Sequence, residues 1–328
     1  MSLSRIVCAL RRLSKFGDGW ATRGRMPLKY FILDVFTERA FGGNPLAVVI
    51  DADALTTAEM QTIAREFNLS ETVFVLKPQS PGHTARMRIF TPAREIPFAG
   101  HPAIGTAALL AGLRAPSGNG EHDAIIALEQ EIGSVRVGVR LRNGQAAYGE
   151  FDAPYSPGTP EKFAEIDEIA AALGLISSEI GFENHRPHKL PGATVFAFVP
   201  IANLEAMSKV SVSPGPWSRA FSNHHISGAY LYTRQCIRAH SSFHARMLAP
   251  DLGIPEDPAT GSAAIGFSRM IQTLDALPDG VHKRSIEQGL EMGRPSTINL
   301  VISVARGQLH SVRIGGHAVQ VAEGVLNA

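Results

Sequence analysis

Two short stretches of this chain combine acidic residues with a glycine that opens an apolar run, and they repeat each other. Residues 95–105 read Glu-Ile-Pro-Phe-Ala-Gly-His-Pro-Ala-Ile-Gly, and residues 256–266 read Glu-Asp-Pro-Ala-Thr-Gly-Ser-Ala-Ala-Ile-Gly. Glu, Pro, Gly, Ala, Ile and Gly coincide at one constant offset, which aligns Gly100 with Gly261. The tripeptide Ala-Arg-Met also precedes both stretches. We interpret the pair as the remains of an internal duplication.

Each of these glycines is expected to form a turn that opens a helix. Pro102 suits a first helical turn, and Ser262 is a good residue for a helix start. Such a turn presents free backbone N–H groups and the positive end of a helix dipole, so two turns facing each other would bind a small anion, most simply a carboxylate. The alternative is two ordinary helix starts that bind nothing. The polar residues beside the glycines, His101 and Ser262, lead us to favour the binding site.

Three polar residues near these turns are candidates for proton transfer. Glu71 opens the apolar run Thr-Val-Phe-Val, where burial would raise its carboxyl pKa toward neutrality; alternatively it faces solvent at a strand edge. His101 lies at a helix start, which disfavours a charged imidazole, so it would be a neutral donor or acceptor or else pack on its own turn. Asp257 would be a second acid or a cap for its turn. Arg86 and Arg246 recur at matching places, and we interpret them as cations that bridge strands or clamp carboxylates.

The composition excludes several classes of protein. With 328 residues, 45% of them hydrophobic, the chain is long enough for two ordinary globular domains. A net charge of +1 offers no basic field for nucleic acid, and no apolar run approaches the ~18 residues of a membrane span. The two cysteines cannot form a disulfide framework and indicate a reducing, cytoplasmic location. No metal-ligand spacing is present, and we interpret His185, His188, His224 and His225 as surface or loop residues.

Residues 1–25 differ in composition from the rest, because six basic residues stand against one acid, Asp18. This segment is either a targeting presequence or the result of a translation start placed too early, with Met26 as the working start. We favour the second interpretation because a strand pattern begins immediately afterwards. In either case we expect an extension outside the core.

The apolar patterns predict a duplicated α+β arrangement. Before the first glycine turn they predict strands at 30–36, 46–50, 72–76 and 85–90, with a helix at 56–67. A meander at 124–151 and a proline-rich linker at 153–160 follow. The second half is expected to contain helices at 161–173 and 204–209 and strands at 194–199, 228–233, 243–248, 298–305 and 310–314. Each half is therefore predicted to be a curved sheet around a helix.

A family resemblance rests on longer motifs. They are Asp34-Val35-Phe36-Thr37 with Phe41 and Gly43-Asn44-Pro45-Leu46-Ala47-Val48-Val49; Asn68-Leu69-Ser70-Glu71-Thr72-Val73-Phe74; Pro97-Phe98-Ala99-Gly100-His101-Pro102; Glu256-Asp257-Pro258-Ala259-Thr260-Gly261-Ser262-Ala263; and Gln288-Gly289 with Glu291-Met292-Gly293-Arg294-Pro295-Ser296. From about Tyr30 to its C-terminus the chain resembles the phenazine-biosynthesis PhzF-like isomerase family, within the diaminopimelate-epimerase-like fold.

The resemblance implies two pseudo-symmetric domains, each a barrel-like, mostly antiparallel sheet around a central helix, with the active site in the cleft between them. We expect the N-terminal domain at 26–152, which the resemblance suggests is completed by 316–328, and the C-terminal domain at 153–315. The resemblance also implies an enzyme without a cofactor, commonly a homodimer.

The resemblance also assigns roles to residues. In that family the residue matching Glu71 moves a proton between two carbons of the substrate, and those matching His101, Asp257 and Ser262 line the same site. We therefore expect a catalytic set of Glu71, His101 and Asp257, and a substrate-binding set of Gly100, Gly261, Ser262 and Thr260.

One departure from the wider fold bears on the mechanism. Racemases and epimerases of this architecture use two cysteines, each immediately before the turn glycine. Here those positions are Ala99 and Thr260, and neither can act as a thiolate. The sequence therefore disfavours stereoinversion by two thiols and favours one carboxyl that removes a proton and returns it elsewhere on the same face of the substrate.

Together these features predict an isomerase that shifts a proton on a small carboxylate. Two alternatives stay open from the sequence. The first is a lyase that uses the same proton abstraction and then loses a hydroxyl or amine. The second is a non-catalytic small-molecule binding protein on this scaffold, which would have no need of an acid/base residue such as Glu71.

Overall fold

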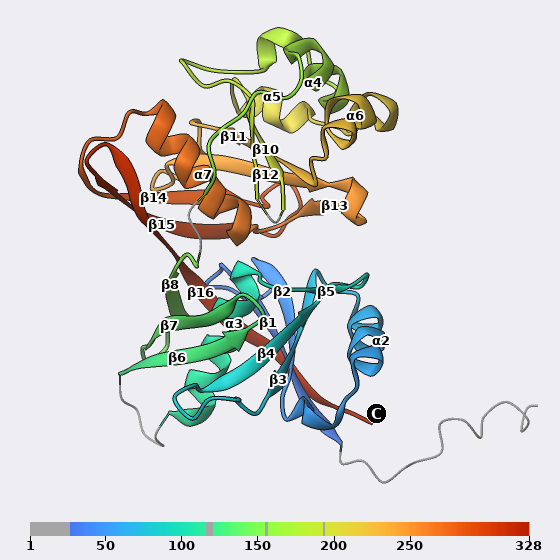
Figure 1. The fold of residues 1–328 in the computed structure, drawn as a ribbon, viewed down its shortest axis with the longest axis vertical. Helices are drawn as coiled ribbons and strands as arrows, with labels where there is room; N and C mark the ends of the chain where they lie inside the picture. The colour runs from blue at the N-terminus through green and yellow to red at the C-terminus, as the bar shows by residue number, and fades with distance from the viewer. Residues whose placement is uncertain (1–26, 116–120, 155–156, 193, 328) are drawn as a thin grey trace, which may run out of the picture.

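Two largely buried helices, each beginning at a turn glycine, lie at the centres of the two lobes seen in Figure 1. The computed structural model describes residues 27–115, 121–154, 157–192 and 194–327. Helix α3 (Gly100–Arg114) is buried at every residue from Gly100 to Ala111, and α7 (Gly261–Leu274) is buried over most of its length. Because α3 is apolar on every side, only a surrounding sheet can shield it from water.

The first lobe is a sheet that closes around α3. In spatial order its strands are β1 (Leu28–Val35), β2 (Asn44–Val49), β3 (Glu71–Leu76), β4 (Ala85–Phe90), β6 (His122–Gln130), β7 (Gly133–Leu141), β8 (Ala147–Asp152) and β16 (Gln308–Leu326), and β16 pairs back onto β1. The two-residue strand β5 (Glu95–Ile96) pairs with β4 and leads into α3. Helix α2 (Thr57–Phe67) lies outside the barrel, and a capping box between Thr56 and Glu59 fixes its start.

The second lobe repeats this plan around α7. Its strands are β9 (His188–Leu190), β10 (Phe196–Pro200), β11 (Gly228–Thr233), β12 (Phe243–Ala249), β13 (Ile254–Asp257), β14 (Gly280–Gln288) and β15 (Ser296–Ala305). Helices α4 (Ile166–Leu173), α5 (Leu204–Lys209) and α6 (Pro214–Ala220) lie at the far end of this lobe (Figure 1). The α+β fold of two similar halves, predicted from the sequence, is confirmed.

One strand runs through both lobes. β16 is 19 residues long; its first part pairs with β15, its middle with β8, and residues 318–326 with β1 (Figure 1). The C-terminal strand thus supplies a wall of the first barrel. The division into domains at residue 152 stays a prediction, because all these strands belong to a single hydrogen-bonded sheet. The predicted extension at 1–25 lies outside the described residues.

The strand registers identify equivalent positions in the two halves. Ile89 faces Ile96 across β4 and β5, as Met247 faces Asp257 across β12 and β13. Further along, Thr72 on β3 pairs with Phe90, as Ala229 on β11 pairs with Leu248. The parallel pairs agree, because Leu46 faces Glu71 where Phe196 faces Gly228. The residue equivalent to Glu71 is therefore Gly228.

Several local predictions need correction. The helix expected at 161–173 begins only at Ile166, and neither β14 nor α6 was expected. His185 is a core residue with 0% exposure, and its ring nitrogens lie 2.9 Å from both the Tyr232 hydroxyl and Asp275 Oδ1. Within the described residues, no helix is both long and apolar enough to cross a membrane. The structure is of one chain, so the homodimer stays a prediction.

Candidate active site

The two glycine turns meet head to head. A Cβ atom placed on Gly100 would lie 3.2 Å from the Cα of Gly261, and one placed on Gly261 would lie 3.3 Å from the Cα of Gly100. Neither position can carry a side chain without moving the opposite backbone. The starts of α3 and α7 thus converge, as the repeat predicted, and their first-turn N–H groups and positive dipole ends are concentrated in one place.

Glu71 and His101 approach each other beside this junction. Glu71 is the first residue of β3 and its side chain is 15% exposed; His101 is the second residue of α3 and its side chain is 4% exposed. Oε2 of Glu71 lies 3.2 Å from Nε2 of His101. Among the described residues neither atom has an aligned hydrogen-bond partner. Two buried polar atoms without partners are unusual, and they mark a place where a ligand could supply the missing bonds.

Asp257 ends β13 and is surrounded by donors from both lobes. The Thr260 hydroxyl donates to Oδ2 at 2.5 Å, and the Asn44 amide donates to Oδ1 at 2.9 Å. The Ser70 hydroxyl adds a longer contact of 3.4 Å to Oδ1. Asn44 and Ser70 belong to the first half of the chain, so this carboxyl group joins the two lobes at the site.

The three ionisable groups are electrostatically distinct. Burial raises the pKa of Glu71 well above its ordinary value, and the nearby charge of Asp257 raises it further. Burial also raises the pKa of Asp257 to about 6, although its hydrogen bonds from Thr260, Asn44 and Ser70 act in the opposite direction. Burial lowers the pKa of His101 to about 3, so its imidazole is neutral at pH 7.

The remaining predicted site residues lie at the second turn. Thr260 precedes α7 and makes no cap hydrogen bond to that helix; its hydroxyl donates to Asp257 and accepts from the Gln288 amide. Ser262 is partly exposed beside Gly261. The structure therefore brings the predicted catalytic set and the predicted binding set to one junction. Their roles in binding and catalysis stay predictions.

Two arginines form ion pairs that join the strands leading into the turns, and the sequence repeat indicated the wrong residue for the one in the first half. Arg246 donates to the Glu256 carboxylate through Nε at 2.9 Å and Nη2 at 2.8 Å. In the first half the same bidentate pair is formed by Arg88 and Glu95, at 2.7 and 2.5 Å. The register makes Arg88, not Arg86, the equivalent of Arg246. Both guanidinium groups are occupied by a carboxylate within their own lobe, so they clamp the strands rather than a substrate.

Three residues of the site had no role assigned from the sequence, although each lies in a motif quoted for the resemblance. Asn44 and Ser70 touch Asp257, and the amide of Gln288 contacts both Asp257 and Thr260. Only their membership of those motifs could have indicated them.

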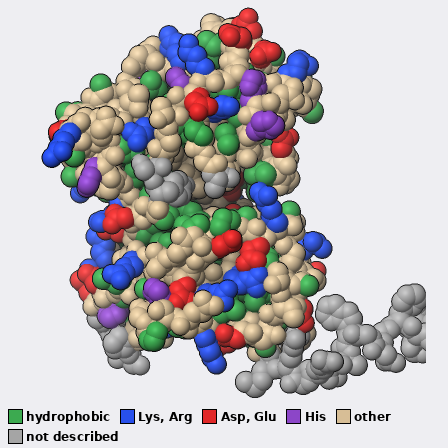
Figure 2. Space-filling view, viewed as in Figure 1, with side chains coloured by type: hydrophobic (Ala, Val, Ile, Leu, Met, Phe, Trp, Pro, Cys, Tyr) green, Lys and Arg blue, Asp and Glu red, His purple; other side chains and the backbone are tan. Residues whose placement is uncertain are grey.

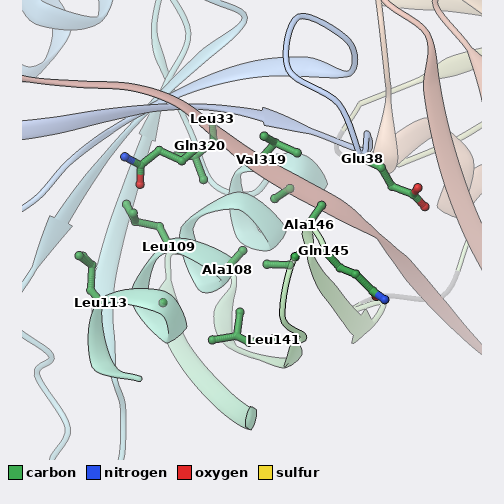
Figure 3. A pocket seen from close by; sticks show the side chains of 14 residues that line it. Leu33, Glu38, Ala108, Leu109, Leu113, Leu141, Gln145, Ala146, Val319 and Gln320 are labelled. Carbon is green, nitrogen blue, oxygen red and sulfur yellow. The ribbon is translucent and has the colours of Figure 1, made fainter. Parts of the chain in front are cut away.

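The site does not include the residues that line a surface cavity at the other end of α3. A cavity of about 600 Å³ is lined by Ala108, Leu109 and Leu113 of α3 and by Val319 of β16 (Figure 3). This end of α3 is opposite to Gly100. Figure 2 shows a hollowed waist between the lobes, with charges of both signs scattered over each lobe. Among the described residues no group of three or more His, Cys, Asp or Glu side chains could hold a metal ion.

Comparisons with known proteins agree with this architecture. The family model described as phenazine biosynthesis-like protein matches residues 33–324. An uncharacterized isomerase of Mesorhizobium japonicum is 49% identical over 300 residues, which cover 90% of this chain and 98% of that protein. The trans-2,3-dihydro-3-hydroxyanthranilate isomerase of Pseudomonas fluorescens is 35% identical with the same coverage. A crystal structure of a PhzF-family phenazine biosynthesis protein of Bacillus anthracis superposes with a TM-score of 0.81 at 23% identity, covering 93% of this chain and 100% of that one.

Proposed function

Since this chain belongs to the phenazine biosynthesis-like protein family and is a PhzF-like isomerase, we propose that it shifts a proton between two carbons of a small carboxylate, with Glu71 as the only proton carrier. In this proposal the reaction needs no cofactor. Glu71 removes the proton from an activated C–H and returns it at another carbon of the same conjugated system.

The observation that carries the proposal is the asymmetry between the two halves. The strand register places Gly228 at the position equivalent to Glu71, so the second lobe has no carboxyl there. The residues before the two turn glycines, Ala99 and Thr260, are not thiols. A stereoinversion needs a proton carrier on each face of the substrate, whereas this arrangement supports abstraction and return on a single face.

The hydrogen bonds around the two carboxyls favour different protonation states. Asp257 accepts from Thr260 and Asn44, and donated hydrogen bonds stabilise a carboxylate. Glu71 Oε2 accepts none among the described residues. We infer that Asp257 carries the negative charge of the pair while Glu71 exchanges the proton. A raised pKa brings a carboxyl closer to working pH, which suits a group that must both take up and release a proton.

The substrate's carboxylate is expected at the junction of α3 and α7. Arg88 and Arg246 are bound to Glu95 and Glu256, so the positive end of a helix, rather than either of these two guanidinium groups, is the better anion partner here. A bound carboxylate would contact the backbone N–H groups near Gly100 and His101 or near Gly261 and Ser262. The relative from Pseudomonas fluorescens is named for trans-2,3-dihydro-3-hydroxyanthranilate, and we propose this compound as the first substrate to test.

The decisive experiment measures product formation and deuterium uptake from D₂O with wild-type protein and with Glu71→Gln. The substitution keeps the shape of the side chain but removes the proton carrier. We expect turnover and exchange to fall by at least about 10²–10⁴-fold, while the native fold is kept and ligand binding stays nearly intact. Asp257→Asn should cost less if Asp257 acts on Glu71 electrostatically. Loss of exchange in Asp257→Asn together with near-normal exchange in Glu71→Gln would reverse the assigned roles, and a product lacking a hydroxyl or amine would indicate a lyase.

A further inference from the structure

Gln288, the last residue of β14, directs all of its side-chain hydrogen bonds to the second glycine turn. It is 0% exposed. Its Nε2 donates to the backbone oxygen of Asp257 at 2.8 Å and to the Thr260 hydroxyl oxygen at 3.1 Å. Its Oε1 accepts from the backbone N–H of Thr260 at 3.2 Å. A backbone carbonyl only accepts and a backbone N–H only donates, so the orientation of this amide is unambiguous.

This orientation determines where the Thr260 proton points. Because the Gln288 amide donates to Oγ1 of Thr260, that oxygen acts as an acceptor on one side. The hydroxyl proton is then available for Asp257 Oδ2, which lies 2.5 Å away. The amide and the hydroxyl form a two-step chain of donors that ends on the carboxyl group. Such a chain favours the ionised form of Asp257.

We propose that Gln288 is a positioning residue, which through the Thr260 hydroxyl keeps Asp257 ionised and so makes Glu71 the group of the pair that takes up and releases the proton. The inference rests on the proposed function of Glu71 and adds to it the group that decides how the two carboxyls share a proton. Gln288 lies behind the turn and acts only through Thr260 and Asp257.

The first half of the molecule offers an internal comparison. Glu129 faces Arg86 across β6 and β4, as Glu287 faces His244 across β14 and β12, so Gln130 is the equivalent of Gln288. The turn in that half has Ala99 in place of Thr260, and it has no hydroxyl to orient. Both polar atoms of the Gln130 amide are buried without a partner among the described residues. The donor chain is therefore complete only on the side that carries Asp257.

Other charged groups around Asp257 also affect its protonation. Glu71 on β3 faces it, with His101 of α3 beyond. Glu256 on its own strand is neutralised by Arg246 of β12. Because Glu71 and Asp257 interact, protons leave the pair in two steps that belong to both groups. The chain from Gln288 is expected to lower the first of these steps.

The test is a carboxyl titration by ¹³C NMR in ligand-free full-length protein labelled at aspartate, with Asp257→Asn used for assignment. Burial and hydrogen bonding together place the pKa of Asp257 at about 6 in the wild type. Thr260→Val removes the hydroxyl but keeps the shape, and should raise the Asp257 midpoint by about one to two pH units, since a hydrogen bond to a charged group is worth about that much. Thr260→Ser, unlike Thr260→Val, keeps the hydroxyl and should titrate with the wild-type midpoint.

Two further variants distinguish the effect of the hydrogen bond that Gln288 donates to Thr260 from the effect of side-chain packing. Gln288→Glu keeps the shape, but an ionised carboxylate cannot donate to Thr260 and attracts its proton away from Asp257, so the midpoint should rise again. Gln130→Glu makes the same change at the equivalent position in the first half and should leave the Asp257 midpoint unchanged. Circular dichroism and thermal melts select variants that keep the native fold.

The proposal is overturned if folded Thr260→Val and Gln288→Glu titrate like the wild type, or if Gln130→Glu shifts the midpoint equally. In the active enzyme the acid limb of the kcat/KM profile should move in the same direction as the midpoint. The titration requires no substrate, so its result stands apart from the deuterium-exchange result for Glu71→Gln. Each of the two proposals can therefore fail without the other.

Discussion

Nε2 of His101 lies 3.2 Å from Oε2 of Glu71, and neither atom has an aligned hydrogen-bond partner among the described residues. Burial lowers the pKa of the imidazole to about 3 and raises the pKa of the carboxyl. Both effects disfavour the charged form of the group concerned. Two groups buried in this way make the stability of the fold depend on pH.

Glu71→Gln should stabilise the protein relative to the wild type as pH rises. The folded-state pKa of Glu71 is raised, so its contribution to stability is fully present below the unfolded pKa of about 4.3 and is lost as pH rises through the folded value. Glutamine carries no proton to lose. The stability difference, measured by urea unfolding from pH 4 to 8, should grow by no more than about 1.4 kcal/mol per pH unit.

Glu66→Gln, at an exposed position on α2, is the matched control and should give a difference that does not change with pH. A Glu71→Gln difference that is equally flat would mean that the Glu71 carboxyl is not held in its neutral form.

His101→Gln should make the protein less sensitive to acid. The folded-state pKa of His101 is lowered to about 3, whereas an unfolded histidine titrates near 6.5, so below about pH 6.5 the unfolded chain binds a proton that the folded one does not. The wild type therefore loses stability as pH falls from about 6.5 toward 3. Thermal melts over this range should show a smaller decline for His101→Gln, whereas the exposed His240→Gln should decline as the wild type does.

Gly100→Ala and Gly261→Ala should separate the two helix starts. Each new methyl carbon would lie 3.2–3.3 Å from the opposite glycine Cα, and such overpacking typically costs about 1–3 kcal/mol. The turns would have to move apart by only a few tenths of an ångström, but catalysis depends steeply on placement, and a displacement of about 1 Å can lower it by about 10²-fold. We therefore expect the rate of deuterium exchange to fall strongly while the melting temperature falls only moderately.

Gly112→Ala in the same helix is the control for these two variants, because its Cβ would meet nothing within 4 Å. It should leave exchange unchanged and stabilise α3 by about 0.5–1 kcal/mol. If Gly100→Ala retained full exchange, the close approach of the two turns would have no part in the reaction.

The sequence could predict those features that are encoded by residues close together in the chain. The convergence of the turns follows from the repeat around Gly100 and Gly261, and the burial of Glu71 follows from the apolar run after it. By contrast, Asn44 reaches Asp257 over a separation of 213 residues, and only the tertiary fold brings them together. His185 looked like a loop residue because its partners, Tyr232 and Asp275, lie 47 and 90 residues further along the chain.

The confusion of Arg86 with Arg88 has a similar origin. The two Ala-Arg-Met tripeptides have the same sequence, which suggests that Arg86 is equivalent to Arg246. The strand registers instead make Arg88 and its partner Glu95 equivalent to Arg246 and Glu256. Identity between short words does not reveal which side of a strand a residue occupies, whereas a pairing register does.

Arg294 should prove to be the main ionic link between the lobes at this site. Its Nη2 donates to Asp34 Oδ1 at 2.5 Å and to the Gly42 oxygen at 2.7 Å, while its Nε donates to the Gly43 oxygen at 2.9 Å. Gly42 and Gly43 directly precede Asn44, the residue that donates to Asp257, and Asp34 pairs with Pro45 across β1 and β2. Lysine cannot reproduce a fork with this geometry, so Arg294→Lys should loosen the segment that carries Asn44.

The expected cost follows from the burial of the partner. Asp34 is 3% exposed, and breaking a buried ion pair costs about 3–5 kcal/mol; for Arg294→Lys, which keeps a charge nearby, we expect about 2 kcal/mol or more by urea unfolding. Arg313→Lys changes an exposed pair with Asp152 and should cost no more than about 1 kcal/mol. Because Asn44 would lose its fixed position, the Asp257 titration midpoint should also rise in Arg294→Lys and stay constant in Arg313→Lys. A destabilised Arg294→Lys with an unchanged midpoint would limit Arg294 to holding the lobes together.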